Sequence, residues 1–237
     1  APEGNKIQWT YDKNNNALTQ TFVAKPGSGL SNIQYVRAYD PVWAKISSTT
    51  DGAGNVNSYS YDAFTGDLIS ASGPVVGGSS PIYSYAYNAR GQVVTVADPT
   101  GVVSRFNYDI STEKLTSVVQ DYNVSLGHLN LTTSIGYDSV GNITSVTDPR
   151  SNQTIFAFDS ERRITQTTVA SPFSYVTNYV YDFNGNLVSI QKPIAGSNAG
   201  HVVSRTFSVT DKVATVTDVL GRVTTLSYDG NDRLQST

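Results

Sequence analysis

Acidic side chains are the commonest groups in this sequence that could carry chemistry. Eight of the 16 aspartates directly follow a large aromatic residue, and a glycine often follows this Asp, or an Asn in its place, within a few residues, as at Gly66, Gly91, Gly141 and Gly185. Paired carboxylates can act as general acid and general base. However, an Asp side chain that bonds to the backbone two residues on, with glycine at a positive φ, is typical of a turn. We therefore interpret these carboxylates as turn residues and predict no catalytic residue.

The remaining candidates for chemistry are also better explained as loop residues. His128 and His201 are 73 residues apart, and neither adjoins a recognisable nucleophile motif, although the two could meet in space. The segment 51–55, Asp-Gly-Ala-Gly-Asn, partly resembles a calcium loop but has too few ligands for an EF-hand, so we interpret it as a hairpin turn. The sequence also lacks a glycine-rich loop before a helix. We therefore predict that the protein has no metal site and no cofactor.

Four Asn-x-Ser/Thr sequons could accept N-linked glycans if the source organism makes them. They lie at Asn123, Asn130, Asn142 and Asn152. With 18 asparagines, and with Ser and Thr at 54 of 237 positions, chance alone gives about four such sites. Asn123 and Asn130 lie in a long gap between repeats, so we expect them to be the most exposed of the four.

Composition excludes several classes of protein. A net charge of -3 with 15% charged residues provides no basic face for nucleic acid or for an anionic membrane surface. No apolar run is long enough to cross a membrane as a helix. Cysteine is absent, which excludes disulfides and thiol chemistry. The chain begins Ala-Pro-Glu-Gly without methionine, which suggests a removed signal peptide or a piece of a longer protein. We expect a secreted or cell-surface protein.

A repeat positions the aspartates. The pair Tyr-Asp, or a close variant, occurs ten times at intervals of 21 to 29 residues, with a mean near 24. In eight of the ten copies a large apolar residue stands two positions before the aromatic, and Arg37 and Arg205 are the exceptions. Residues i and i+2 of a strand face the same side, whereas in a helix they would not. Each copy therefore predicts a strand with a bulky pair on one face.

The residues between successive turns are rich in Val, Thr, Ile and Tyr, which favours strands. Each repeat contains two such segments, a turn after Tyr-Asp and a second turn such as Asp98-Pro99-Thr100-Gly101. The sequence thus predicts an all-β protein: tandem hairpins in a curled antiparallel sheet or a β-solenoid-like spiral of about twenty short strands. We treat residues 1–237 as one array of about ten repeats, either part of a larger protein or an assembling subunit.

Aromatic side chains are the predicted contacts between neighbouring repeats, as a cross-strand ladder. A carbohydrate-stacking platform is the alternative interpretation of tyrosines such as Tyr83, Tyr85 and Tyr87. The predicted packing residues are Trp9, Tyr11, Tyr39, Tyr59, Tyr61, Tyr85, Tyr87, Phe106, Tyr108, Tyr137, Phe156, Phe158, Tyr179, Tyr181, Phe207 and Tyr228.

These copies resemble the YD repeat, also called the RHS repeat, whose pattern is roughly Tyr-Asp-x-x-Gly-Arg/Asn-Leu, a strand, Asp-Pro-x-Gly and a further strand. The nearest copies are 137–149, 87–101, 181–187 and 228–234. The resemblance implies a long, spirally winding sheet. In bacterial Rhs proteins, toxin-complex BC pairs and teneurins, such sheets form hollow shells, and the bacterial shells surround a toxic polypeptide. The autoproteolytic aspartate signature of those shells has no counterpart here.

We therefore predict a non-catalytic extracellular scaffold rather than an enzyme. About twenty strands at about 4.8 Å spacing would close a ring only about 30 Å across, which is too narrow to enclose folded cargo alone. The alternatives are a filament subunit assembling end to end through open β edges, a fragment of a toxin-encapsulating shell, and a glycan- or receptor-binding adhesin. The expected partners are further copies of the chain, the remainder of a larger YD-repeat protein, a glycan or a cell-surface receptor.

Overall fold

The fold is seen in a computed structural model, which describes residues 6–123, 125, 127–169, 174–194 and 197–237. The side chains of residues 193–201 are not among those that the structure describes. All regular structure in the described residues is β-strand, as the sequence predicts.

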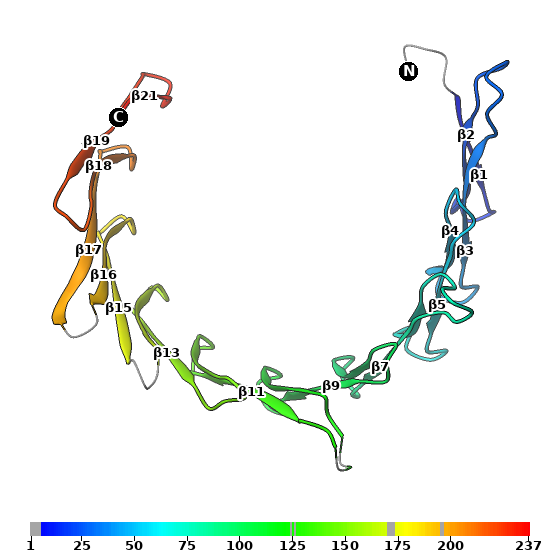
Figure 1. Ribbon diagram of the computed structural model, residues 1–237, viewed down its shortest axis with the longest axis horizontal. Helices are drawn as coiled ribbons and strands as arrows, with labels where there is room; N and C mark the ends of the chain where they lie inside the picture. The colour runs from blue at the N-terminus through cyan, green and yellow to red at the C-terminus, as the bar shows by residue number, and fades with distance from the viewer. Residues whose placement is uncertain (1–5, 124, 126, 170–173, 195–196) are drawn as a thin grey trace. The chain divides into compact units, whose positions relative to one another are not determined.

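Twenty-one short strands follow one another along the chain (Figure 1). They are β1 (Lys6–Tyr11), β2 (Ala17–Val23), β3 (Ile33–Tyr39), β4 (Ile46–Thr50), β5 (Val56–Tyr61), β6 (Leu68–Ser72), β7 (Ile82–Tyr87), β8 (Val93–Ala97), β9 (Val103–Tyr108), β10 (Leu115–Gln120), β11 (Leu131–Tyr137), β12 (Ile143–Thr147), β13 (Gln153–Phe158), β14 (Ile164–Val169), β15 (Tyr175–Tyr181), β16 (Leu187–Ile194), β17 (Ser197–Phe207), β18 (Val213–Thr217), β19 (Val223–Thr225), β20 (Ser227–Tyr228) and β21 (Leu234–Ser236).

Nineteen of these strands form one antiparallel sheet in which sequence neighbours pair, and β20 and β21 form a two-stranded sheet. The prediction of about twenty antiparallel strands arranged as hairpins is therefore confirmed. Within a hairpin the register shifts at the Tyr of Tyr-Asp, for example between Gly136 and Tyr137 of β11. This shift is a β-bulge, which bends the strand where the turn begins. The spiral winding of the sheet stays a prediction.

One turn geometry recurs at both ends of the strands. In the turn at 138–142, Gly141 N donates to Asp138 O and Asp138 N donates to Asn142 O. This is a three-residue hairpin loop, a type I turn followed by a residue in the left-handed region. Gly141 provides that residue with φ of 100°. The Asp-Pro turn at 148–152 has the same bonds, with Ser151 in the left-handed position.

The chain divides into two compact units, Ala1–Tyr108 with Val118–Leu131 and Asp109–Ser117 with Thr132–Thr237. Each unit is a series of hairpins. That residues 1–237 form one array of repeats stays a prediction. No helix in the part of the chain that the structure describes is long and apolar enough to cross a membrane.

A single layer of sheet leaves the side chains only partly covered. Among the described residues no hydrophobic or polar side chain is buried, and the accessible surface is 15856 Å². A compact monomer of 25.5 kDa would expose about 10,400 Å². The described residues therefore form no second layer of the kind that normally covers a sheet face.

Candidate functional site

Aspartate carboxylates close the turns by accepting hydrogen bonds from the turn residues. In the turn at 138–142, Asp138 Oδ1 accepts hydrogen bonds from the backbone nitrogens of Val140, Gly141 and Asn142 at 2.7 to 3.0 Å. Its Oδ2 accepts from Asn142 Nδ2 at 2.8 Å. Asp51 binds Ala53, Asn55 and the Asn55 side chain in the same way. The segment 51–55 is thus a turn, and the Asp51 carboxylate already accepts hydrogen bonds from within it. No group of three or more potential metal ligands occurs among the residues described.

These hydrogen bonds lower the carboxyl pKa values. In twelve aspartates the bonds to the carboxylate outweigh the opposing effect of partial burial. At Asp109 the hydroxyl of Ser111 and the backbone and hydroxyl of Thr112 lower the pKa to about 2. The others are Asp12, Asp51, Asp62, Asp98, Asp121, Asp138, Asp148, Asp159, Asp182, Asp218 and Asp229. A carboxylate with a lowered pKa is ionised at neutral pH and is therefore a poor general acid.

Tyrosine hydroxyls connect each hairpin to the one before it. The Tyr of Tyr-Asp donates from its hydroxyl to the backbone carbonyl of the first residue of the preceding even-numbered strand; we call this the inter-hairpin Tyr bond. It occurs seven times: Tyr39–Ala17 (3.0 Å), Tyr61–Ile46 (2.7 Å), Tyr87–Leu68 (2.9 Å), Tyr108–Val93 (2.9 Å), Tyr137–Leu115 (2.8 Å), Tyr181–Ile164 (3.0 Å) and Tyr228–Val213 (3.1 Å). Burial is the main cause of the raised pKa of Tyr61 and Tyr87.

Basic side chains cover several of the same rings. Lys45 Nζ lies 5.4 Å from the ring centre of Tyr61, Lys114 Nζ lies 4.9 Å from that of Tyr137, and the Arg163 guanidinium lies 4.7 Å from that of Tyr181. Each basic residue directly precedes an even-numbered strand, and we call this the cover position. A cation over an aromatic face is attracted by the ring quadrupole. A tyrosine hydroxyl and a covering cation thus join these pairs of hairpins.

Two repeats lack both contacts. Phe158 and Phe207 replace the tyrosine, so they have no hydroxyl to donate. The cover positions before them hold Asn142 and Asn186, whose Nδ2 atoms donate to Asp138 and Asp182 of their own turns. The cover positions before Tyr39, Tyr87 and Tyr108 also hold no cation, but there the inter-hairpin Tyr bond is kept. Phe158 and Phe207 therefore lose the hydroxyl as well as the cation.

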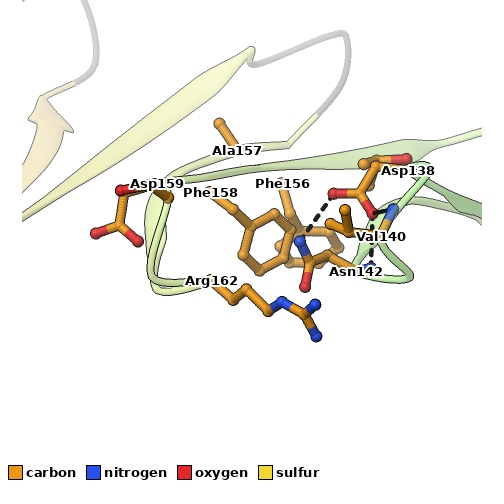
Figure 2. A pocket seen from close by; sticks show the side chains of 10 residues that line it. Asp138, Val140, Asn142, Phe156, Ala157, Phe158, Asp159 and Arg162 are labelled. Atoms are coloured by element: carbon orange, nitrogen blue, oxygen red, sulfur yellow. Dashed lines mark hydrogen bonds between the residues drawn. The ribbon is translucent and has the colours of Figure 1, made fainter.

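A pocket of about 430 Å³ lies at the first of these interruptions. Figure 2 shows the rings of Phe156 and Phe158 between the turns that begin at Asp138 and Asp159, with Arg162 beside them. Arg162 has φ of 64° and takes the turn position that Gly141 takes in the hairpin before. Its guanidinium has no partner among the residues that the structure describes.

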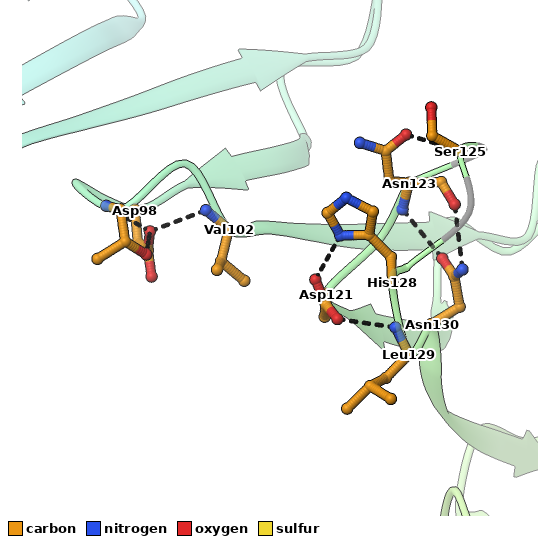
Figure 3. Close-up of polar contacts among 9 residues, drawn as sticks. Asp98, Val102, Asp121, Asn123, Ser125, His128, Leu129 and Asn130 are labelled. Atoms are coloured by element: carbon orange, nitrogen blue, oxygen red, sulfur yellow. Dashed lines mark hydrogen bonds and ion pairs between the residues drawn. The ribbon is translucent and has the colours of Figure 1, made fainter.

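Hydrogen bonds of histidine and asparagine side chains hold together the long loop between β10 and β11. His128 Nδ1 lies 2.7 Å from Asp121 Oδ1, and Leu129 N donates to Asp121 Oδ2 (Figure 3). Asn123 N donates to Asn130 Oδ1, and Asn130 Nδ2 donates to Asn123 O. His128 is thus a structural loop residue. The His201 side chain lies outside the described residues.

The four sequons differ in how their side chains are used. Asn142 and Asn152 donate through Nδ2 to the aspartates of their turns, and Asn130 donates to Asn123. Asn123 accepts a bond from Ser125 N, and its Nδ2 has no partner among the described residues. Asn130 and Asn152 are exposed, whereas Asn123 and Asn142 are half-buried, so the expected exposure is found at Asn130 and not at Asn123. Glycosylation itself stays a prediction.

The predicted packing aromatics lie on odd-numbered strands and on β20. Trp9 and Tyr11 lie on β1, Tyr39 on β3, Tyr59 and Tyr61 on β5, Tyr85 and Tyr87 on β7, Phe106 and Tyr108 on β9, Tyr137 on β11, Phe156 and Phe158 on β13, Tyr179 and Tyr181 on β15, Phe207 on β17 and Tyr228 on β20. Arg37, one of the two exceptions to the apolar pattern, lies 5.8 Å from the ring centre of Trp9. Sequence reasoning missed the basic cover positions, although the Arg/Asn before Leu in the repeat pattern was a usable signal.

Comparison with protein families matches residues 137–172 to the RHS Repeat. These residues include the last residue of β11 and all of β12, β13 and β14, and therefore every residue that lines the pocket. No curated protein matches the sequence.

Solved structures of Tc toxins are similar to this chain over most of its length. A complex described as TcdB2-TccC3 without the hypervariable C-terminal region matches 95% of the chain with a TM-score of 0.69 and 16% identity. The Tc holotoxin pore of Photorhabdus luminescens, carrying the TccC3 mutation D651A, matches the same share with a TM-score of 0.69 and 17% identity. This chain spans 14% of each of those chains. At this level of identity the likeness shows the fold.

Proposed function

We propose that this chain, which carries an RHS repeat at residues 137–172, is a non-catalytic section of the wall of a larger, extracellular, shell-like protein. The observation that carries the proposal is the single-layered sheet, in which no described hydrophobic side chain is buried. A single layer of this kind needs something to cover its faces, because a sheet face normally packs against a second layer. The fold it shares with Tc toxin structures supports the same conclusion, since it spans only 14% of those chains.

The contacts between neighbouring hairpins support a mechanical role, in which the hairpins form one continuous length of wall. Inter-hairpin Tyr bonds join seven pairs of neighbouring hairpins, and a covering cation is added at three of them. In such an array stability is a sum of repeat and nearest-neighbour terms, so the wall can be lengthened by adding repeats. The turn aspartates supply rigid corners, because their carboxylates accept hydrogen bonds from their own turns. We therefore assign the tyrosines, the covering cations and the turn aspartates to structural support of the sheet. We propose that the complete shell holds the cargo or partner.

The isolated chain tests this proposal. We expect light scattering to give masses above 25.5 kDa that rise with concentration, and we expect an apolar dye to bind and fluoresce. Incompletely covered apolar side chains, such as Ile7 and Ile33 at 49% exposure, are the physical reason. A concentration-independent monomer that binds no dye would contradict the wall proposal. Uniform end-to-end filaments in the electron microscope would instead favour an assembling filament subunit.

A further inference from the structure

The pocket between the Asp138 and Asp159 turns lies beside the Phe158 ring, over which no basic side chain lies from the cover position. At Tyr61, Tyr137 and Tyr181 a basic side chain lies over the ring from the cover position. At Phe158 the cover position holds Asn142, which is too short to do so and is held by Asp138 at 2.8 Å. The space over the ring therefore stays open, with a volume of about 430 Å³. This volume is within the range of small-molecule sites.

Polar groups without partners line the same space. Thr144, Ser160 and Arg162 all line the pocket, and their side chains form no hydrogen bond or ion pair with the rest of the described chain. Thr144 and Ser160 supply hydroxyls that can donate or accept, and the Arg162 guanidinium supplies donors alone. The Phe156 and Phe158 rings supply flat apolar surface beside them (Figure 2). A site with a few polar groups around an aromatic surface is the usual form of a ligand pocket.

The local charges disfavour a charged ligand. An anion would face the Asp138 carboxylate in the pocket lining, whereas Asp159 and Glu161 are ion-paired with Arg163. A cation would face Arg162, which projects from the turn position that a covering Lys or Arg tip approaches in other repeats, as Lys114 approaches Gly141. A neutral ring avoids both repulsions.

We propose that this pocket binds a neutral sugar ring. The C–H face of the ring would pack on Phe156 and Phe158, because an aromatic face is negative and attracts weakly positive hydrogens. The ring hydroxyls would pair with Thr144, Ser160 and Arg162, which have no partners in the described chain. This inference is independent of the wall proposal, since a shell wall and a free adhesin could both present the site.

The test is titration of the isotopically labelled 237-residue chain with methyl glycosides of glucose, galactose, mannose and N-acetylglucosamine, followed by nuclear magnetic resonance. We expect at least one glycoside to shift the amide signals of residues 140–144 and 156–162. The variant Asn142→Lys should weaken that binding at least about tenfold, because its side chain would cover Phe158 as Lys114 covers Tyr137.

The matched control is Asn186→Lys, the same change before Phe207, which should leave the binding unchanged. Thermal unfolding of both variants checks that each still folds. The proposal is overturned if no glycoside shifts these signals, or if Asn142→Lys binds as well as the unmodified chain. Stronger shifts with ethylammonium or propionate would also overturn it, because they would assign the pocket to a charged ligand.

Discussion

Replacing Tyr137 with alanine is expected to lower the free energy of unfolding of its unit by about 2 to 3 kcal/mol. The loss combines the packing of a half-buried ring, where a fully buried aromatic costs about 3 to 5 kcal/mol, with two specific contacts. Tyr137 donates to Leu115 O at 2.8 Å, and Lys114 lies 4.9 Å from its ring centre. Urea unfolding followed by tyrosine fluorescence measures the change.

Two companion variants separate the hydroxyl from the ring. Tyr137→Phe removes only the inter-hairpin Tyr bond and should cost about 1 kcal/mol, the usual net value of one hydrogen bond. Phe158→Tyr should stabilise by a similar amount, because its new hydroxyl would face the carbonyl of Ile143, the first residue of β12. If Tyr137→Ala and Tyr137→Phe were equally mild, the ring would not be a contact between hairpins.

Acid is expected to unfold the protein over a narrow range of pH. Folding lowers the pKa of the turn aspartates, so the unfolded chain binds protons at a higher pH than the folded chain. Their contribution to stability is therefore complete above the ordinary carboxyl pKa of 3.8 and is lost as the pH falls toward the folded value, about 2 at Asp109. We expect the urea midpoint to be level from pH 7 to about 5 and to fall steeply from pH 4 to pH 2.

The turn at 88–92 supplies the control for this prediction. Asn88 accepts backbone bonds from Arg90 and Gln92 there, with no group that titrates. Asp138→Asn should create the same arrangement in the turn at 138–142. That variant should lose less stability than the unmodified chain between pH 4 and pH 2. A urea midpoint that did not change over this range would show that the turn carboxylates contribute nothing.

Much of the fold followed from local sequence because each hairpin contacts its sequence neighbours. The alternation around Tyr137, the turn chemistry of Asp138 and Gly141, and the spacing of the copies predict strand, turn and hairpin order correctly. In contrast, the hydroxyl of Tyr137 reaches a carbonyl 22 residues earlier. No periodicity within one repeat shows that contact.

The pocket could not be predicted for a related reason. It depends on three substitutions in two successive repeats, with Asn142 at the cover position, Phe158 in place of tyrosine and Arg162 in place of glycine. Each is unremarkable in isolation, and only their placement at one contact between hairpins leaves the space open. Similarly, the pairing of His128 with Asp121 needed the loop conformation, because the two residues are separated by a turn.

Electron microscopy of the natural protein that contains these residues tests the central claim most directly. We predict that residues 6–237 will form part of a continuous β-sheet wall facing an enclosed space, with β1 to β19 in the order found here. A structure in which a second layer of the same domain covers this sheet, with no enclosed space beside it, would contradict the assignment as a shell wall.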